Sequence, residues 1–131
     1  MGNLSFVDKY GCVYDLNDGN ILFRECVYII MIKDNQVLCN CDQISGLMSF
    51  PSDEVVDVSV VPSTSFSIFA YIVENGMYVK ELQKYNIFEV EEVYIENASF
   101  KWCDVDDLLL GKIKFDATQI TGLKNLLVRV R

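Results

Sequence analysis

The chain has 131 residues, a formal net charge of −8 and 51% hydrophobic residues. This length and composition indicate one folded domain and exclude intrinsic disorder as the default state. The acidic balance disfavours nucleic-acid binding and adsorption to an anionic membrane. The longest unbroken apolar run, Cys26 to Ile32, is too short to cross a bilayer, and the N-terminus lacks a signal-peptide pattern, so a cytoplasmic protein is expected.

The chain contains no histidine and five cysteines. The lack of histidine excludes Ser-His-Asp and Cys-His catalysis and any imidazole metal site. The odd number of cysteines, none of them in a zinc-site spacing, predicts free thiols. Acid–base chemistry would therefore have to come from carboxylates, Lys, Tyr or Cys.

The first half of the chain is typical of a β-hairpin. Residues 17–20 predict a turn, and Ile21 to Ile32 follows as an apolar, β-branched strand. A turn at residues 33–35 leads to a second strand, Gln36 to Cys41, which we expect to be antiparallel to the first. Leu47 to Pro51 predicts a short extended piece.

The segment Phe66 to Val73 permits two interpretations. Its aromatic and β-branched residues favour a strand. A helix is also consistent with the pattern, because hydroxyl groups in residues 62–65 could cap it and Gly76 would follow its end. The local composition alone favours the strand.

Two further strands are predicted at Met77 to Glu81 and at Tyr85 to Ile95. Asp104 can cap a short helix that runs through Leu110, and residues 116–119 match a capping box with Asp at the cap. The terminal helix after this box has an apolar stripe made of Ile120, Leu123, Leu126, Leu127 and Val130. Strands interleaved with two or three helices predict a mixed α/β fold.

The order of these elements and several short motifs resemble the Nudix hydrolase superfamily. The motifs are Arg24 in the entry strand, Gly46 to Pro51, Gly76-Met77, and Lys101 to Leu108. The resemblance implies one domain over residues 1–131, built as a Nudix-like α/β/α sandwich with a mixed sheet. It also implies a helix at Phe66 to Val73, against the local preference for a strand.

The family's signature reads G-x5-E-x7-R-E-U-x-E-E-x-G-U, where U is apolar, and its Glu residues bind divalent cations that neutralise a diphosphate and activate water. Alignment on Gly76 and the following Met places Phe69, Ala70 and Val73 where Arg and two Glu are expected. Only Glu74 of the paired Glu residues is retained. The resemblance therefore implies a degenerate signature in an acidic protein.

Two functional hypotheses follow from the resemblance. In the first, the chain has lost magnesium-dependent pyrophosphohydrolase activity, needs no cofactor, and binds a nucleotide-like small molecule or a protein partner. That partner could be a second copy in a homodimer. In the second, the chain is a divergent active hydrolase that cleaves a nucleoside diphosphate-linked substrate with Mg²⁺ or Mn²⁺.

The second hypothesis requires a rebuilt carboxylate site. Its metal ligands would be Glu74, Asp53, Glu54 and Asp57, and its general base Glu91 or Glu92. For the carboxylates in residues 53–57 the favoured interpretation is solvated charges on a loop. For residues 89–92 it is the solvent-exposed face of a strand.

Overall fold

The computed structural model describes residues 4–16, 19–53, 62–91 and 99–130, and these form a mixed eight-stranded sheet with few helices. The strand order is β2-β1-β6-β7-β3-β4-β5, with β8 paired to β4 off this path. The strands are β1 (Ser5–Val7), β2 (Val13–Asp15), β3 (Ile21–Lys33), β4 (Gln36–Cys41), β5 (Met48–Ser49), β6 (Thr64–Glu74), β7 (Met77–Glu89) and β8 (Phe100–Asp104). The helices are α1 (Val105–Leu109), the 3-10 turn η1 (Ala117–Gln119) and α2 (Ile120–Val130).

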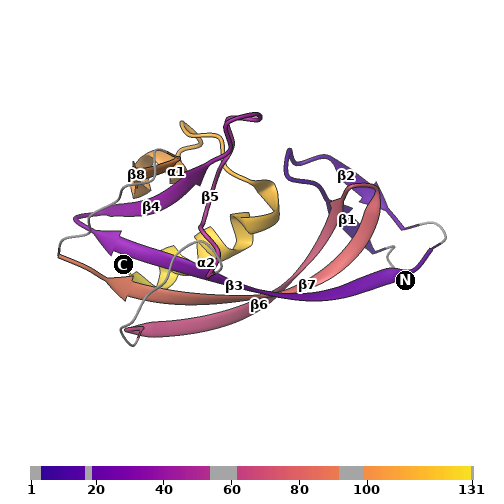
Figure 1. Ribbon diagram of the computed structural model, residues 1–131, viewed down its shortest axis with the longest axis horizontal. Coiled ribbons are helices and arrows are strands. Elements are labelled where there is room, and N and C mark those ends of the chain that lie inside the picture. The colour runs from indigo at the N-terminus through magenta and orange to yellow at the C-terminus, as the bar shows by residue number, and fades with distance from the viewer. Residues whose placement is uncertain (1–3, 17–18, 54–61, 92–98, 131) are drawn as a thin grey trace.

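Three long strands, β3, β6 and β7, curve together across the molecule (Figure 1). β3 and β7 pair in parallel from Ile21 opposite Tyr78 to Ile32 opposite Glu89. β6 and β7 form an antiparallel hairpin whose turn is Asn75-Gly76, and both turn residues have positive φ, 51° and 75°. Such a turn matches the right-handed twist of the paired strands. Gly76 therefore serves a hairpin turn and does not end a helix.

The family resemblance implied a helix at Phe66 to Val73. This prediction is wrong, because the segment lies within β6. Its aromatic and β-branched residues pair with β7 along their whole length, and Phe66 and Ile72 are buried. The strand accordingly starts at Thr64, and the hydroxyl groups of residues 63–65 do not cap a helix. The strands expected at Met77 to Glu81 and at Tyr85 to Ile95 belong to one strand, which ends at Glu89; residues 92–95 of the second expectation lie outside the described residues.

Other local predictions are confirmed. The strand Gln36–Cys41 is antiparallel to β3, and the Asp104 side chain accepts a hydrogen bond from the Asp106 N–H at the start of α1. Asp116 caps η1, which leads into α2, but the expected capping box is not completed. The side chain of Gln119 accepts instead from the Phe50 N–H at 2.7 Å. All five cysteines are free, as predicted.

The main core lies between one face of the sheet and the two described α-helices. It includes Tyr28, Phe50 and Tyr85 from the sheet side, Leu108 of α1, and Leu126 of α2. A second cluster of buried apolar residues occupies the opposite face: Ile29, Met31, Leu38 and Phe88. Among the described residues, no helix is long and apolar enough to cross a membrane.

Helix α2 approaches the sheet closely at a glycine. A Cβ atom added to Gly122 would overlap the phenol ring of Tyr85, which is fully buried and stacks on Tyr28 and Phe66. The glycine therefore sets the distance between helix and sheet.

We expect Gly122→Ala to destabilise the fold by about 1–3 kcal/mol, because overpacking of a buried contact outweighs alanine's better helix propensity. Urea denaturation would measure this free energy of unfolding. The matched control is Lys124→Ala at an exposed position of the same helix, which should change stability little. A more stable Gly122→Ala protein would contradict the close approach.

Candidate ligand-binding cleft

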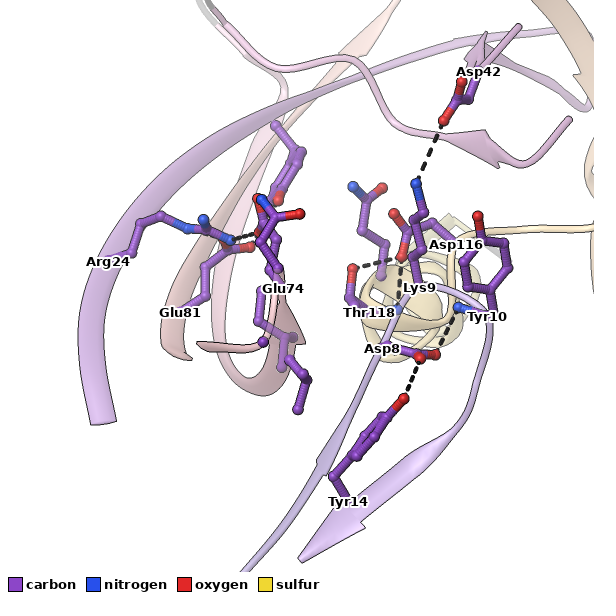
Figure 2. Close-up of a pocket in the computed structure, with 16 residues that line it drawn as sticks. Asp8, Lys9, Tyr10, Tyr14, Arg24, Asp42, Glu74, Glu81, Asp116 and Thr118 are labelled. Carbon is purple, nitrogen blue, oxygen red and sulfur yellow. Dashed lines mark hydrogen bonds and ion pairs between the residues drawn. The ribbon is translucent and has the colours of Figure 1, made fainter. Parts of the chain in front are cut away.

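A cleft of about 620 Å³ opens on the same face of the sheet as the main core. Its walls come from the β1–β2 turn, from β3, from the β6–β7 hairpin and from η1. Figure 2 shows its polar side chains in two groups, one around Arg24 and the other around Lys9. The charged residues of the lining are Asp8, Lys9, Arg24, Asp42, Glu74, Glu81 and Asp116.

The first group is a three-membered ion network. Parallel pairing places Arg24 of β3 directly opposite Glu81 of β7. The Arg24 Nε and Nη2 atoms each lie 2.7 Å from Glu81 Oε2, and Nη2 also lies 2.7 Å from Glu74 Oε2 (Figure 2). Partial burial would lower the pKa of Arg24, but its hydrogen bonds to Glu74 and Glu81 outweigh this and raise it. The guanidinium therefore bridges two carboxylates.

The Glu81 carboxylate is only 1% exposed and is held by further donors. The Tyr28 hydroxyl donates to Glu81 Oε1 at 2.7 Å, and Gln83 Nε2 donates to the same oxygen at 3.0 Å and to the Thr118 carbonyl at 2.9 Å. The Tyr85 hydroxyl donates to Gln83 Oε1 at 2.7 Å. Burial and the Glu81 charge raise the pKa of Tyr28, so its hydroxyl stays protonated and donating. The base of the cleft is thus polar but fully hydrogen-bonded.

The opposite wall is the turn between β1 and β2, which Asp8 organises. Asp8 Oδ1 accepts hydrogen bonds from the Tyr10 and Cys12 N–H groups at 3.0 and 2.9 Å, and Oδ2 accepts from the Tyr14 hydroxyl at 3.0 Å. Desolvation would raise the pKa of Asp8, but the hydrogen bonds from Cys12 and Tyr14 prevail and lower it. The Asp8 carboxylate therefore holds the β1–β2 turn in the conformation that forms this wall of the cleft.

Lys9 connects this wall to two other parts of the fold. Its Nζ lies 3.7 Å from Asp42 Oδ2 in an exposed ion pair, and its carbonyl accepts the Ala117 N–H at 3.0 Å (Figure 2). An exposed pair of this length contributes little to stability, so the ammonium can change partners at small cost.

Asp116 is the remaining carboxylate of the lining. It accepts from the Thr118 N–H at 2.9 Å and from the Thr118 hydroxyl at 2.6 Å (Figure 2). Burial raises the pKa of Asp116, and the two hydrogen bonds from Thr118 oppose that rise without cancelling it. Each carboxylate that the structure describes in the cleft lining is therefore engaged by a protein group.

The structure separates the carboxylates proposed from the sequence. Glu74 ends β6 beside the cleft, whereas Asp53 does not line the cleft and its N–H donates to the Val27 carbonyl at 3.0 Å. Glu91 is exposed just beyond the opposite end of β7, roughly 45 Å from Glu74 along the chain direction at about 3.3 Å per residue. The other candidates, Glu54, Asp57 and Glu92, lie outside the described residues.

The alignment that made Glu74 the retained signature Glu required a helix, and the segment is a strand. Only residues 52–63 lie between Pro51 and the start of β6. The signature pattern contains about twice as many positions as this segment. Within the described parts of the chain, no three acidic or cysteine side chains are grouped so that they could hold a metal ion.

Sequence reasoning missed Glu81 and Gln83, which are buried at the base of the cleft. The sequence contained a signal for this, because Val79, Tyr85 and Ile87 stand at every second position of the same series as Glu81 and Gln83. A continuous strand through residues 77–89 would have placed both polar side chains on the core face. We instead expected a break between residues 81 and 85.

The raised pKa of Asp116 predicts a pH dependence of stability. A carboxyl whose folded pKa exceeds its unfolded value contributes stability that is full below pH 3.8 and lost as pH rises through the folded pKa. Asp116→Asn keeps an oxygen acceptor for Thr118 but removes the titration. We expect the wild type to lose stability relative to this variant as pH rises above 3.8, measured by urea denaturation across acidic pH. Parallel pH profiles would contradict the assignment.

Comparison with known proteins shows which solved structures have a similar fold. No family model matches the chain, and no curated protein is similar to it in sequence. Among solved structures, the NUDIX domain of Shewanella oneidensis NrtR, complexed with ADP ribose, is 15% identical with a TM-score of 0.53, covering 87% of this chain and 91% of that one. The C. elegans Ap4A hydrolase is 10% identical with a TM-score of 0.53, covering 82% and 97%.

The E. coli ORF135 protein is also similar, at 15% identity and a TM-score of 0.51, with 84% and 93% of the two chains covered. These alignments extend over most of each chain, although the sequences have diverged almost completely. The resemblance seen in the sequence is therefore confirmed at the level of structure: this chain has a Nudix-like fold, a mixed sheet with few helices.

Proposed function

We propose that this protein has a Nudix-like fold without the family's magnesium-dependent hydrolysis and that its cleft binds a nucleotide-like ligand. The observation that carries the proposal is the engagement of the cleft carboxylates by the protein itself. Glu81 accepts from three side chains, Glu74 from Arg24, and Asp116 from Thr118. Carboxylates occupied in this way are poorly placed to share a magnesium ion, which needs several free oxygen ligands.

The length of the chain before β6 supports the same conclusion. Residues 52–63 are too few to contain the full signature between Pro51 and the strand. The alternative, an active hydrolase, would have to assemble Glu74 with Asp53, Glu54 and Asp57 around Mg²⁺ or Mn²⁺ and use Glu91 or Glu92 as base. The separation of Glu74 from Glu91 along β7 weighs against that arrangement.

The charges of the lining suggest which part of a ligand the cleft contacts. Among the described residues of the lining, five carboxylates face two cationic side chains, Lys9 and Arg24. Sugar hydroxyls and base amino groups can donate to carboxylates, whereas a bare polyphosphate would be repelled. Tyr10 is 63% exposed and offers a ring on which a base could stack. ADP ribose, the ligand of the NrtR domain, combines these hydroxyl and base groups with a diphosphate that Lys9 could contact.

The proposal predicts binding without turnover. We expect ADP ribose to bind in the presence of a chelator, as measured by calorimetry, and inorganic pyrophosphate to bind far more weakly because it has no donors for the carboxylates. Assays with Mg²⁺ or Mn²⁺ should yield no AMP or other mononucleotide from ADP ribose or diadenosine tetraphosphate. Metal-dependent turnover that Glu74→Gln abolishes would establish the hydrolase alternative instead.

A charge substitution locates the ligand in the cleft. Lys9→Gln should weaken ADP ribose binding about tenfold, equivalent to ~1.4 kcal/mol, through loss of a charged contact to phosphate. The matched control is Lys101→Gln on β8, an exposed lysine that does not line the cleft. Equal weakening by both variants would indicate a general effect of net charge, and no effect of Lys9→Gln would place the phosphates elsewhere.

A further inference from the structure

The buried charge of Glu81 is compensated without the help of Glu74. Its Oε2 atom accepts hydrogen bonds from Arg24 Nε and Nη2 at 2.7 Å, and its Oε1 atom accepts from Tyr28 and from Gln83. A buried carboxylate needs a cation and further hydrogen-bond donors, and these three side chains supply both. The second carboxylate on the same guanidinium, that of Glu74, is therefore not required to balance the buried charge.

Glu74 is the exchangeable partner of Arg24. Its side chain is 48% exposed at the end of β6, and among the described residues its carboxylate has one side-chain partner, Arg24 Nη2, at 2.7 Å. The Arg24 side chain is itself 40% exposed and lines the cleft (Figure 2). An ion pair this accessible to water contributes little to stability, so an incoming anion can displace the Glu74 carboxylate at small cost.

We propose that Arg24 binds a phosphate group of the cleft ligand and that Glu74 competes with this phosphate for the Arg24 guanidinium. Carboxylate and phosphate oxygens are both negatively charged acceptors, and a guanidinium binds either through the same fork of N–H donors. When the phosphate binds, Glu74 turns toward solvent while Arg24 keeps its bonds to Glu81. This inference rests on the proposed function, because the anion is the diphosphate of the nucleotide-like ligand.

The competition makes the cleft selective. Arg24 and Lys9, the cations of the described lining, lie in the two separate groups of Figure 2. Each is paired with an exposed carboxylate, Arg24 with Glu74 and Lys9 with Asp42. A diphosphate must displace such a carboxylate before it can contact the cation, and the remaining carboxylates repel it. The cleft therefore discriminates against simple anions and favours a ligand whose hydroxyl or amino groups also donate hydrogen bonds.

Calorimetry with inorganic pyrophosphate, in the presence of a chelator, tests the proposal. Glu74→Gln removes the competing charge but keeps the size of the side chain, so it should bind pyrophosphate about tenfold more tightly than the wild type. The matched control is Glu25→Gln, because Glu25 also forms an exposed ion pair, with Lys84 at 2.9 Å, but does not line the cleft. This control should leave the affinity unchanged. No gain in Glu74→Gln, or an equal gain in both variants, would overturn the proposal.

Nuclear magnetic resonance locates the bound anion. In Glu74→Gln, titration with pyrophosphate should shift the Nε–H resonance of Arg24 with the same dissociation constant that calorimetry gives. The N–H groups of Tyr10 and Cys12, which Asp8 holds in the opposite wall, report on the neighbourhood of Lys9. A shift confined to these two N–H groups would place the anion at that wall and reject the role of Arg24.

The inference and the proposed function can fail separately. If the wild type binds ADP ribose but Glu74→Gln gains no affinity for pyrophosphate, the role of Glu74 is rejected and the binding function stands. If neither protein binds ADP ribose but Glu74→Gln gains affinity for pyrophosphate, the anion site at Arg24 stands and the nucleotide-like ligand is rejected. Under the hydrolase alternative Glu74 is a metal ligand, so its substitution should weaken metal-dependent binding instead.

Discussion

The fold depends on the burial of one carboxylate, Glu81, within the parallel pairing of β3 and β7. A carboxylate that is 1% exposed must be compensated, and breaking a buried ion pair typically costs about 3–5 kcal/mol. Arg24, Tyr28 and Gln83 supply that compensation from two neighbouring strands. A shift of one residue between β3 and β7 would turn Arg24 to the opposite face and leave Glu81 without its cation. The network thereby specifies the register of the sheet.

The same network determines the chemistry of the cleft. Because Gln83 donates to Glu81 and to the Thr118 carbonyl and accepts from the Tyr85 hydroxyl, the cleft floor is joined to η1. The ligand proposed above would add hydrogen-bond donors at the rim of this preorganised floor. The floor offers few free carboxylate oxygens for a cation. This engagement of Glu81 by protein donors is the physical basis of the proposal that the family's metal chemistry is lost.

The long curved strands have two surfaces with different properties. One face of β3, β6 and β7 carries Arg24, Glu74 and Glu81 beside the cleft. The other face carries Phe23 and Phe69 around Lys80. Because side chains alternate along a strand, the polar cleft and the aromatic patch use successive residues of the same segments. The cleft and the exposed rings of Phe23 and Phe69 therefore lie on opposite faces of the sheet and share no side chains.

Local sequence determined much of the secondary structure of this protein. The cap at Asp104, the strand Gln36–Cys41 and the cap at Asp116 follow from side-chain chemistry within a few residues, and the structure contains all three. Strand propensity at Phe66 to Val73 was also a correct guide, because aromatic and β-branched side chains fit a pleated, half-buried surface. The resemblance to the Nudix family predicted the fold but misplaced the helix, since its signature was aligned on a glycine that serves a hairpin turn.

Tertiary structure alone decided the cleft. Local propensity could not reveal that Glu81 and Gln83 belong to a core face, because polar residues are buried only when partners from distant segments compensate them. Those partners lie 57 residues away at Arg24 and 35 residues away at Thr118. The sequence by itself thus determined the caps, the turns and most strands. Long-range pairing determined which charges are buried, which remain at the cleft rim and which aromatic rings stay exposed.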